Sequence, residues 1–271
     1  MIFLSLLGCA HRPPSDGAAP STRVAVALEA WSSHAPESVD WDAAGFSNDE
    51  WYVSFVKGQL VVDHNPPEQG DALPFTVDRR GEADLGGERH VLAVEGGYLV
   101  GFNAGEFGGG AWWFSADGAR RKKLTLRASD PIADYVPENV HGFAHLDHDV
   151  LVFEGLTHGG GNWGRVVRLH RGSDAEWYPS VFAELSACPH AVVTESASNW
   201  LFATTSGIWR LDAQAHALPV WQPVGSHLYY PNTIVRDRSG VVYMGMRAFV
   251  VMLTPRGTMD YVVRVLAPPR T

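Results

Sequence analysis

The stretch "EFGGGAWWFSADGARRKKL", residues 106–124, and the stretch "THGGGNWGRVVRLHRGSDAEW", residues 157–177, share one layout and begin 51 residues apart. Each opens near a run of three glycines, continues into an apolar run and reaches a tight turn that contains glycine. A phosphate-binding loop would instead place its glycines between a strand and the first turn of a helix. Because strand-forming residues follow the glycines here, we interpret both stretches as copies of one structural unit.

The second half of this unit, a hairpin with a tight turn, recurs along the chain. Glycine in such a turn supplies the positive φ that short hairpin connections need. The five copies are WYVSFV-KG-QLVV at 51–62, AWWFSA-DG-ARRKKLTL at 111–126, RVVRLH-RG-SDAEWYP at 165–179, GIWRLD-AQ-AHALPVW at 207–221 and FVVMLT-PRG-TMDYVV at 249–263.

A further pair of strands precedes each of the last four hairpins. These pairs cover residues 91–102, 143–154, 192–204 and 234–245. Each unit is therefore predicted to be a meander of four strands, A to D, with a period of about 40–50 residues, typical of propeller blades. A single meander cannot bury both of its faces, so neighbouring units must stack around an axis.

The sequence thus predicts an all-β fold, a β-propeller of five four-stranded antiparallel blades, with six blades as the alternative. Four blades lie between residues 88 and 267, and residues 24–80 leave room for a divergent one. We expect the strand "RVAVALEA", residues 23–30, to join the last blade and close the ring.

The N-terminus indicates an envelope protein. "MIFLSLLGCA" is a short apolar run that ends in Leu6-Leu7-Gly8-Cys9 and resembles a bacterial lipobox, which implies a signal at 1–9 and a lipid on Cys9. Residues 10–22 are rich in Pro, Ser, Ala and Gly and are predicted to form a flexible tether to a single domain at 23–271. Ala10, in place of the aspartate of inner-membrane lipoproteins, implies an outer-membrane anchor that faces the periplasm.

Charge and cysteine content narrow the function further. The net charge of −9 argues against nucleic-acid binding, and the run Arg120–Lys123 is predicted to lie in an outer strand. If Cys9 carries lipid, Cys188 has no disulfide partner, so we expect a lone buried thiol. We expect the domain to be a monomer.

A periodic set of polar residues begins strand A of the four clear blades. The set is His90, His141, His190 and Asn232, at separations of 51, 49 and 42 residues. Propeller geometry should bring these side chains to one level of the central channel. Such a ring could bind a small ligand or, alternatively, a divalent metal ion; it could also merely hydrogen-bond the strands themselves.

A second candidate surface is the face formed by the B–C and D–A connections, here called the loop face. Its aromatic, Asn and Arg residues suit a protein or glycan partner. The candidates are Asn103, Glu106, Phe107, His158, Asn162, Trp163, Arg247, Tyr229 and Tyr230, with Tyr135 and Asn139 at the start of another blade.

The last blade, "YPNTIVRDRSGVVYMGMRAFVVMLTP" at 230–255, resembles blades of gluconolactonase/regucalcin-like propellers. In that family a Pro-Asn-Gly opening supplies a metal ligand, which the resemblance places at Asn232. The family's catalytic Asp falls at Gly245-Met246, where no acid stands.

Two interpretations follow. The favoured one is a non-catalytic, lipid-anchored propeller that uses one loop face to bind a protein, a glycan or a small ligand and carries no cofactor. The alternative is a metal-dependent hydrolase or lyase, lactonase-like, centred on the His/Asn ring. Motifs of serine hydrolases, zinc proteases and P-loops are absent from the sequence, and we assign no catalytic residue.

Overall fold

The structure is a computed structural model that describes residues 28–79, 82–126, 138–223, 228, 230–257 and 260–269. The proposed signal, the lipid site at Cys9 and the tether therefore lie outside the described residues. None of the helices in the described part of the chain has the length and apolar character needed to cross a membrane.

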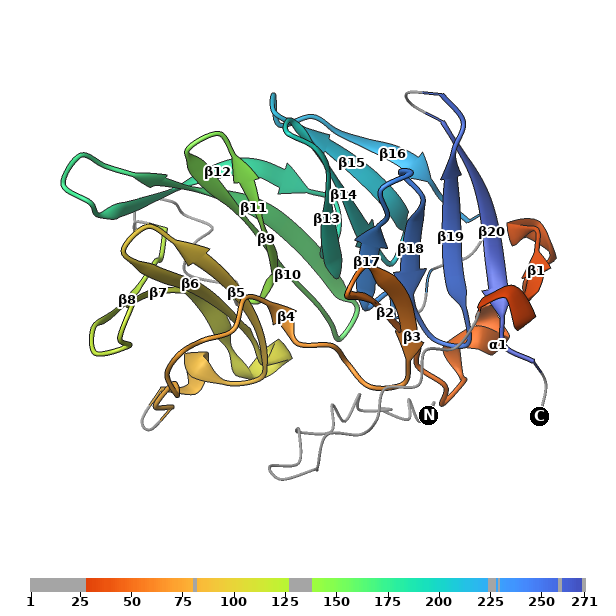
Figure 1. Ribbon diagram of the computed structural model, residues 1–271, viewed down its shortest axis with the longest axis horizontal. Coiled ribbons are helices and arrows are strands. Elements are labelled where there is room, and N and C mark those ends of the chain that lie inside the picture. The colour runs from red at the N-terminus through yellow and green to blue at the C-terminus, as the bar shows by residue number, and fades with distance from the viewer. Residues whose placement is uncertain are drawn as a thin grey trace, which may run out of the picture.

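The protein is a five-bladed β-propeller in which four blades have the predicted four-stranded meander (Figure 1). Blade 2 contains β5 (Glu88–Val94), β6 (Gly97–Asn103), β7 (Gly109–Ser115) and β8 (Arg121–Lys123). Blade 3 contains β9 (Val140–Leu146), β10 (Asp149–His158), β11 (Gly161–Arg171) and β12 (Trp177–Leu185). Blade 4 contains β13 (Ala191–Ser196), β14 (Asn199–Thr204), β15 (Gly207–Asp212) and β16 (Ala217–Trp221). Blade 5 contains β17 (Thr233–Arg236), β18 (Val242–Gly245), β19 (Val250–Pro255) and β20 (Tyr261–Ala267).

Blade 1 departs from the expected four strands. It is a two-stranded hairpin of β2 (Tyr52–Val56) and β3 (Gln59–Asp63). Its turn residues Lys57 and Gly58 both have positive φ, at 52° and 79°, which matches the twist of the flanking strands. The first strands β5, β9, β13, β17 and β2 contact one another in that order around the axis, so the 51–62 hairpin supplies the inner strands of blade 1 and not the outer pair that we predicted.

Two short strands complete the ring. β4 (Gln69–Gly70) pairs in parallel with β5 at His90 and Val91, between β5 and the hairpin of blade 1 in Figure 1. β1 (Ser32–His34) pairs with β20 as a fifth strand of blade 5. The closing strand is thus 32–34, whereas we predicted 23–30; within that range the described residues 28–30 form a single 3-10 turn instead.

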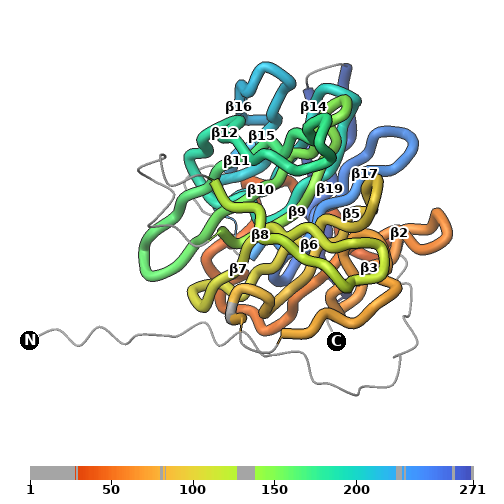
Figure 2. Tube along the Cα trace, turned by 90° about the vertical axis from the view of Figure 1, so that its left-hand side faces the viewer, coloured from red at the N-terminus to blue at the C-terminus, as the bar shows by residue number. Residues whose placement is uncertain are grey.

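Helical structure is limited to short segments in the described residues. They are η1 (Leu28–Ala30), η2 (Pro36–Ser38), α1 (Trp41–Gly45), η3 (Ala83–Leu85) and η4 (Gly105–Phe107). Asp40 caps α1 by accepting a hydrogen bond from the Ala43 amide at 2.9 Å. Figure 2 views the molecule from the side of blade 2, whose strands lie in front of the other blades.

The core lies between the blades, as stacked meanders require. Second strands such as β10 and β14 are buried along most of their length, whereas the fourth strands β12 and β20 contain exposed residues at intervals. β8, which carries most of the Arg120–Lys123 run, is the outermost strand of blade 2, as predicted. Continuous apolar runs therefore became inner strands, and charged runs became edges.

Ionic contacts also join neighbouring blades. Arg165 of β11 is buried and pairs with Glu154 of the same blade at 3.0 Å, and Glu138, at the entry to blade 3, lies 3.5 Å from that guanidinium and 3.5 Å from Lys123 Nζ of blade 2. Within blade 4, Glu195 accepts hydrogen bonds from Arg210 at 2.5 Å and 2.6 Å, and the Tyr261 hydroxyl of blade 5 donates to the same carboxylate at 2.6 Å.

Candidate ligand-binding channel

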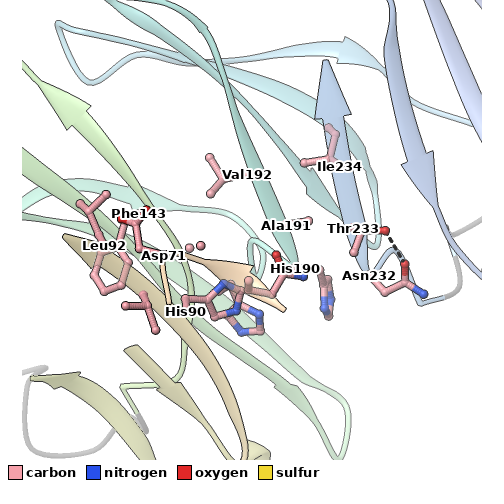
Figure 3. A pocket seen from close by; sticks show the side chains of 15 residues that line it. Asp71, His90, Leu92, Phe143, His190, Ala191, Val192, Asn232, Thr233 and Ile234 are labelled. Atoms are coloured by element: carbon pink, nitrogen blue, oxygen red, sulfur yellow. Dashed lines mark hydrogen bonds between the residues drawn. The ribbon is translucent and has the colours of Figure 1, made fainter. Parts of the chain in front are cut away.

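The first strands of blades 2 to 5 line one central cavity of about 310 Å³. Because side chains two residues apart point to the same side of a strand, these strands place two successive rings in the channel. The polar ring consists of His90, His141, His190 and Asn232. The apolar ring consists of Leu92, Phe143, Val192 and Ile234. In Figure 3 the labelled His90, His190 and Asn232 lie on one side of the cavity, with Leu92, Val192 and Ile234 beyond them.

The three imidazoles of the polar ring are neutral at neutral pH. Burial lowers the pKa of His90 and of His190 to about 3, and the nearby His141 acts in the same direction on both. Burial likewise lowers the pKa of His141 to about 4, against the opposing effect of its hydrogen bond to the Gly155 carbonyl. Each neutral imidazole therefore has one donor and one acceptor nitrogen and carries no charge, and those of His141 already contact the Gly155 carbonyl and Asn103 Nδ2.

A thiol also lies against this polar ring, and the periodicity of the blades did not predict it. Cys188 is 1% exposed, and its Sγ is 3.3 Å from His141 Nε2. The His141 and His190 rings are 5.7 Å apart and nearly perpendicular. One ligand atom from each of His141, Cys188 and His190 falls within 4.8 Å of the others. Cys188 is the lone buried thiol that we predicted, but burial raises its pKa to about 12 in the immediate company of two imidazoles.

Two facing glycines allow the Cys188 turn to reach the channel wall. Gly155 and Gly164 are partners across β10 and β11. A Cβ on Gly164 would meet the Ala187 carbonyl oxygen at 2.4 Å, and one on Gly155 would lie 3.0 Å from Cys188 Cα. Because neither Gly155 nor Gly164 has a side chain, the turn that carries Cys188 can lie close to His141.

The channel also contains residues of β4 and the residue that follows it, which the sequence did not reveal. Gln69 and Asp71 line the cavity, and Asp71 accepts a hydrogen bond from the Ala93 amide at 2.7 Å. Asp71 is the one carboxylate among the described residues that line the cavity. The segment around Asp71, "NPPEQGDALP", has the composition of a loop, so no strand pattern could have predicted that Asp71 lines the channel.

Asn232 lies in the polar ring, but no acid stands where the family resemblance implies a catalytic one. Its Oδ1 accepts a hydrogen bond from Thr233 Oγ1 at 3.1 Å, and its Nδ2 is buried and unpartnered within the described residues. At the position where the family resemblance implies an acid, a Cβ on Gly245 would meet the Trp51 carbonyl oxygen at 2.3 Å, and Met246 is fully buried. A catalytic carboxylate has no place there.

The loop-face candidates lie at the ends of the blades, and two pairs of them contact each other, Glu106 with His158 and Arg247 with Tyr230. Asn103 Nδ2 lies 3.4 Å from His141 Nδ1, so this face is continuous with the polar ring. His158 Nε2 pairs with Glu106 at 2.6 Å across blades 2 and 3. Phe107 is 75% exposed.

The remaining loop-face candidates are likewise held in place. Asn162 Oδ1 accepts hydrogen bonds from Thr157 Oγ1 and the Cys188 amide. Trp163 is half-buried, with the Arg165 guanidinium 6.0 Å from its ring. Arg247 bonds Glu50 at 3.0 Å and stacks 3.5 Å from the Tyr230 ring. Asn139 is buried and donates to the Gly105 carbonyl at 2.9 Å, while Tyr135 and Tyr229 lie outside the described residues.

Sequence periodicity alone brings together the four ring residues, because each begins strand A of its blade. The same reasoning did not predict Cys188, because this residue has no equivalent in the other blades. Its only signal is the spacing Cys188-Pro189-His190, which ties the thiol to a ring residue in the same connection.

No protein-family model matches the chain, and neither does any curated protein. Among solved structures, a gluconolactonase from Xanthomonas campestris is similar with 13% identity and a TM-score of 0.43, over 68% of this chain and 62% of that one. A streptogramin B lyase is similar with 12% identity and a TM-score of 0.45, over 91% of this chain and 76% of that one. This chain thus spans less than two thirds of the gluconolactonase, and the activities named belong to those proteins.

Proposed function

We propose that the protein is a binding module whose central channel takes a neutral small molecule with an apolar body and a hydrogen-bonding head. The observation that carries the proposal is the stack of a neutral His/Asn ring on an apolar ring around one cavity of about 310 Å³. Ligand pockets in proteins combine an apolar lining with a few convergent polar groups in this way, and their volumes start at roughly 300 Å³.

The charge of the channel defines the class of ligand. Neutral imidazoles give no electrostatic attraction to an anion, and the net charge of −9 adds none. Asn232 Nδ2 adds an unpartnered donor beside the ring. A hydroxyl or carbonyl head can satisfy these donors and acceptors, while Leu92, Phe143, Val192 and Ile234 surround the apolar body.

We favour binding over hydrolysis because the channel lacks an acid–base pair among its described lining residues. Asp71 already accepts a backbone hydrogen bond, and Gly245-Met246 leaves no space for a carboxylate. Attachment to the bacterial envelope through a lipid on Cys9 is part of the proposal, and the intact mass of membrane-extracted protein tests it.

Thermal unfolding in the presence of neutral sugars, cyclic esters and aromatic alcohols tests the channel as the binding site. A ligand at a hundredfold its Kd stabilises the fold by about 2.7 kcal/mol, which raises Tm by roughly 5–10 °C in a chain of this size. Val192→Phe should abolish the shift, because Val192 Cγ1 is packed against Gly142 and a larger side chain must project into the channel.

The matched control is Val181→Phe on the exposed side of β12, which should keep the shift. A shift that survives in Val192→Phe would move the binding site out of the channel. Turnover of a cyclic ester, followed by chromatography, would replace the binding proposal with the hydrolase alternative.

A further inference from the structure

We propose that His141, Cys188 and His190 form a binding site for one zinc-class divalent transition-metal ion in the wall of the channel. Imidazole nitrogen and thiolate sulfur are the ligands that zinc prefers, and catalytic or ligand-binding zinc sites keep three protein ligands and one open position. The site differs from the His/Asn ring because it uses the thiol and leaves out His90 and Asn232. It shares the cavity of the proposed function, and its metal binding is measured without any organic ligand.

The geometry is close to that of a metal site. In a tetrahedral zinc site with bonds of about 2.0–2.3 Å, ligand atoms lie roughly 3.3–3.8 Å apart. The three donor atoms here fall within 4.8 Å of one another, and the Cys188 Sγ to His141 Nε2 distance is already 3.3 Å. Rotations of side chains that contract the cluster by about 1 Å would complete the coordination.

His141 lies in β9, whereas Cys188 and His190 share the connection before β13, and both Cys188 and His141 have contacts that can orient them. Asn162 Oδ1 accepts the Cys188 amide at 2.7 Å, and Asn162 Nδ2 donates to Thr205 Oγ1 at 2.9 Å, which fixes the turn. When Nε2 binds the metal, the imidazole proton moves to His141 Nδ1, so the Asn103 amide, whose Nδ2 lies 3.4 Å from Nδ1, would turn its Oδ1 toward the ring to accept that proton. Metal sites rely on such outer contacts to orient their ligands.

Metal binding would change the local bonds in a defined way. The Cys188 thiol proton passes to solvent as the sulfur–metal bond forms, and His141 Nε2 exchanges its 3.1 Å contact with the Gly155 carbonyl for the metal. Because His141 and His190 line the cavity and Cys188 does not, the metal would be held from the wall side. Its fourth position would then face the channel, where water or the hydrogen-bonding head of a ligand can bind.

Titration of the untagged full-length Cys9→Ser chain with Co²⁺ tests the site. The chain has two cysteines, so this variant keeps only the Cys188 thiol. We expect one equivalent of Co²⁺ to produce the near-ultraviolet charge-transfer band of a cobalt–thiolate bond, and one equivalent of Zn²⁺ to remove it. A titration that gives no such band overturns the proposal, whether or not organic ligands bind the channel.

Single substitutions then assign the ligands. His141→Gln and His190→Gln should each weaken Co²⁺ binding at least about tenfold, while His145→Gln on the exposed side of β9 should not. Cys188→Ser in the wild-type background should lose the band although Cys9 remains. A band that persists in Cys188→Ser, or equal losses in His145→Gln, would show that the metal binds elsewhere and overturn the site.

Discussion

At the scale of single residues, two glycines determine how close the Cys188 turn comes to the channel. Gly164 has ordinary backbone angles, so its role is spatial: a Cβ there would lie 2.4 Å from the Ala187 carbonyl oxygen and 2.7 Å from Pro189 Cδ. Contacts below 3 Å with backbone cannot be relieved by a rotamer change. The turn itself must move, and Cys188 moves with it.

Gly164→Ala should therefore destabilise the protein by about 1–3 kcal/mol, the usual cost of overpacking a tight interior. Chemical denaturation followed by circular dichroism measures this loss. Gly161→Ala is the matched control on the same strand, because its Cβ would meet only the His158 carbonyl oxygen, at 3.3 Å. Equal stability of the two variants would mean that the turn has room to relax.

The same scale shows where sequence reasoning stopped for the site. His90, His141, His190 and Asn232 could be predicted because a repeat converts sequence period into spatial convergence. Cys188 could not, since its position depends on two bare backbone sites in a neighbouring pair of strands. Packing of this kind leaves no periodic trace in the sequence.

At the scale of elements, contacts between blades rest partly on ionised groups. Burial raises the pKa of Glu195, but the hydrogen bonds from Arg210 and Tyr261 outweigh it and leave that pKa below its ordinary value. A carboxyl whose pKa is lower in the folded chain than in the unfolded chain stabilises the fold above the unfolded pKa, here about 4.5. This stabilisation is lost as the pH falls through the folded pKa.

Glu195→Gln should consequently cost about 1–3 kcal/mol of unfolding free energy at pH 7, the range for charged hydrogen bonds. The deficit relative to wild type should shrink as the pH drops below about 4.5 and then through the lower pKa of the folded Glu195 carboxyl, below which the wild-type side chain is also neutral. Urea denaturation across the pH range in which the wild type stays folded measures it, with the exposed Glu184→Gln of β12 as control. A deficit that does not change with pH would show that the shape of the Glu195 side chain, not its charge, stabilises the fold.

Strands differ in how readily the sequence predicts them, and burial explains the difference. The strands of blades 2 to 5 carry apolar periods set by stacking on neighbours, so their patterns mark them. β4 and β1 exist because they pair with an exposed strand edge: β4 covers β5, and β1 covers β20. All three residues of β1 are exposed, so no apolar alternation distinguished β1 from the flanking loop. Residues 23–30 do alternate, and for that reason we predicted the closing strand there.

At the scale of the whole molecule, the ring has one reduced blade and must be stabilised where blade 1 meets blade 5. Trp51, next to β2, packs edge-on against Trp31 with ring centroids 4.8 Å apart, and both indoles are buried. They share a core cluster with Val62 of blade 1 and Val250 of blade 5. Trp31 lies directly before β1, so one short segment adds both an edge strand and an aromatic anchor to the junction.

The junction predicts a sharp dependence of stability on residues 28–34. A chain that starts at residue 35 should lose at least about 3 kcal/mol relative to one that starts at residue 28, since loss of a buried tryptophan alone costs about 3–5 kcal/mol. The expected fall in Tm is roughly 6–12 °C for a domain of this length, measured by circular dichroism. Trp31→Ala in the full chain separates the indole from β1, which that variant retains. If the chains starting at 28 and at 35 melt together, the ring closes through the β2–β17 contact alone, and β1 only covers the edge of β20.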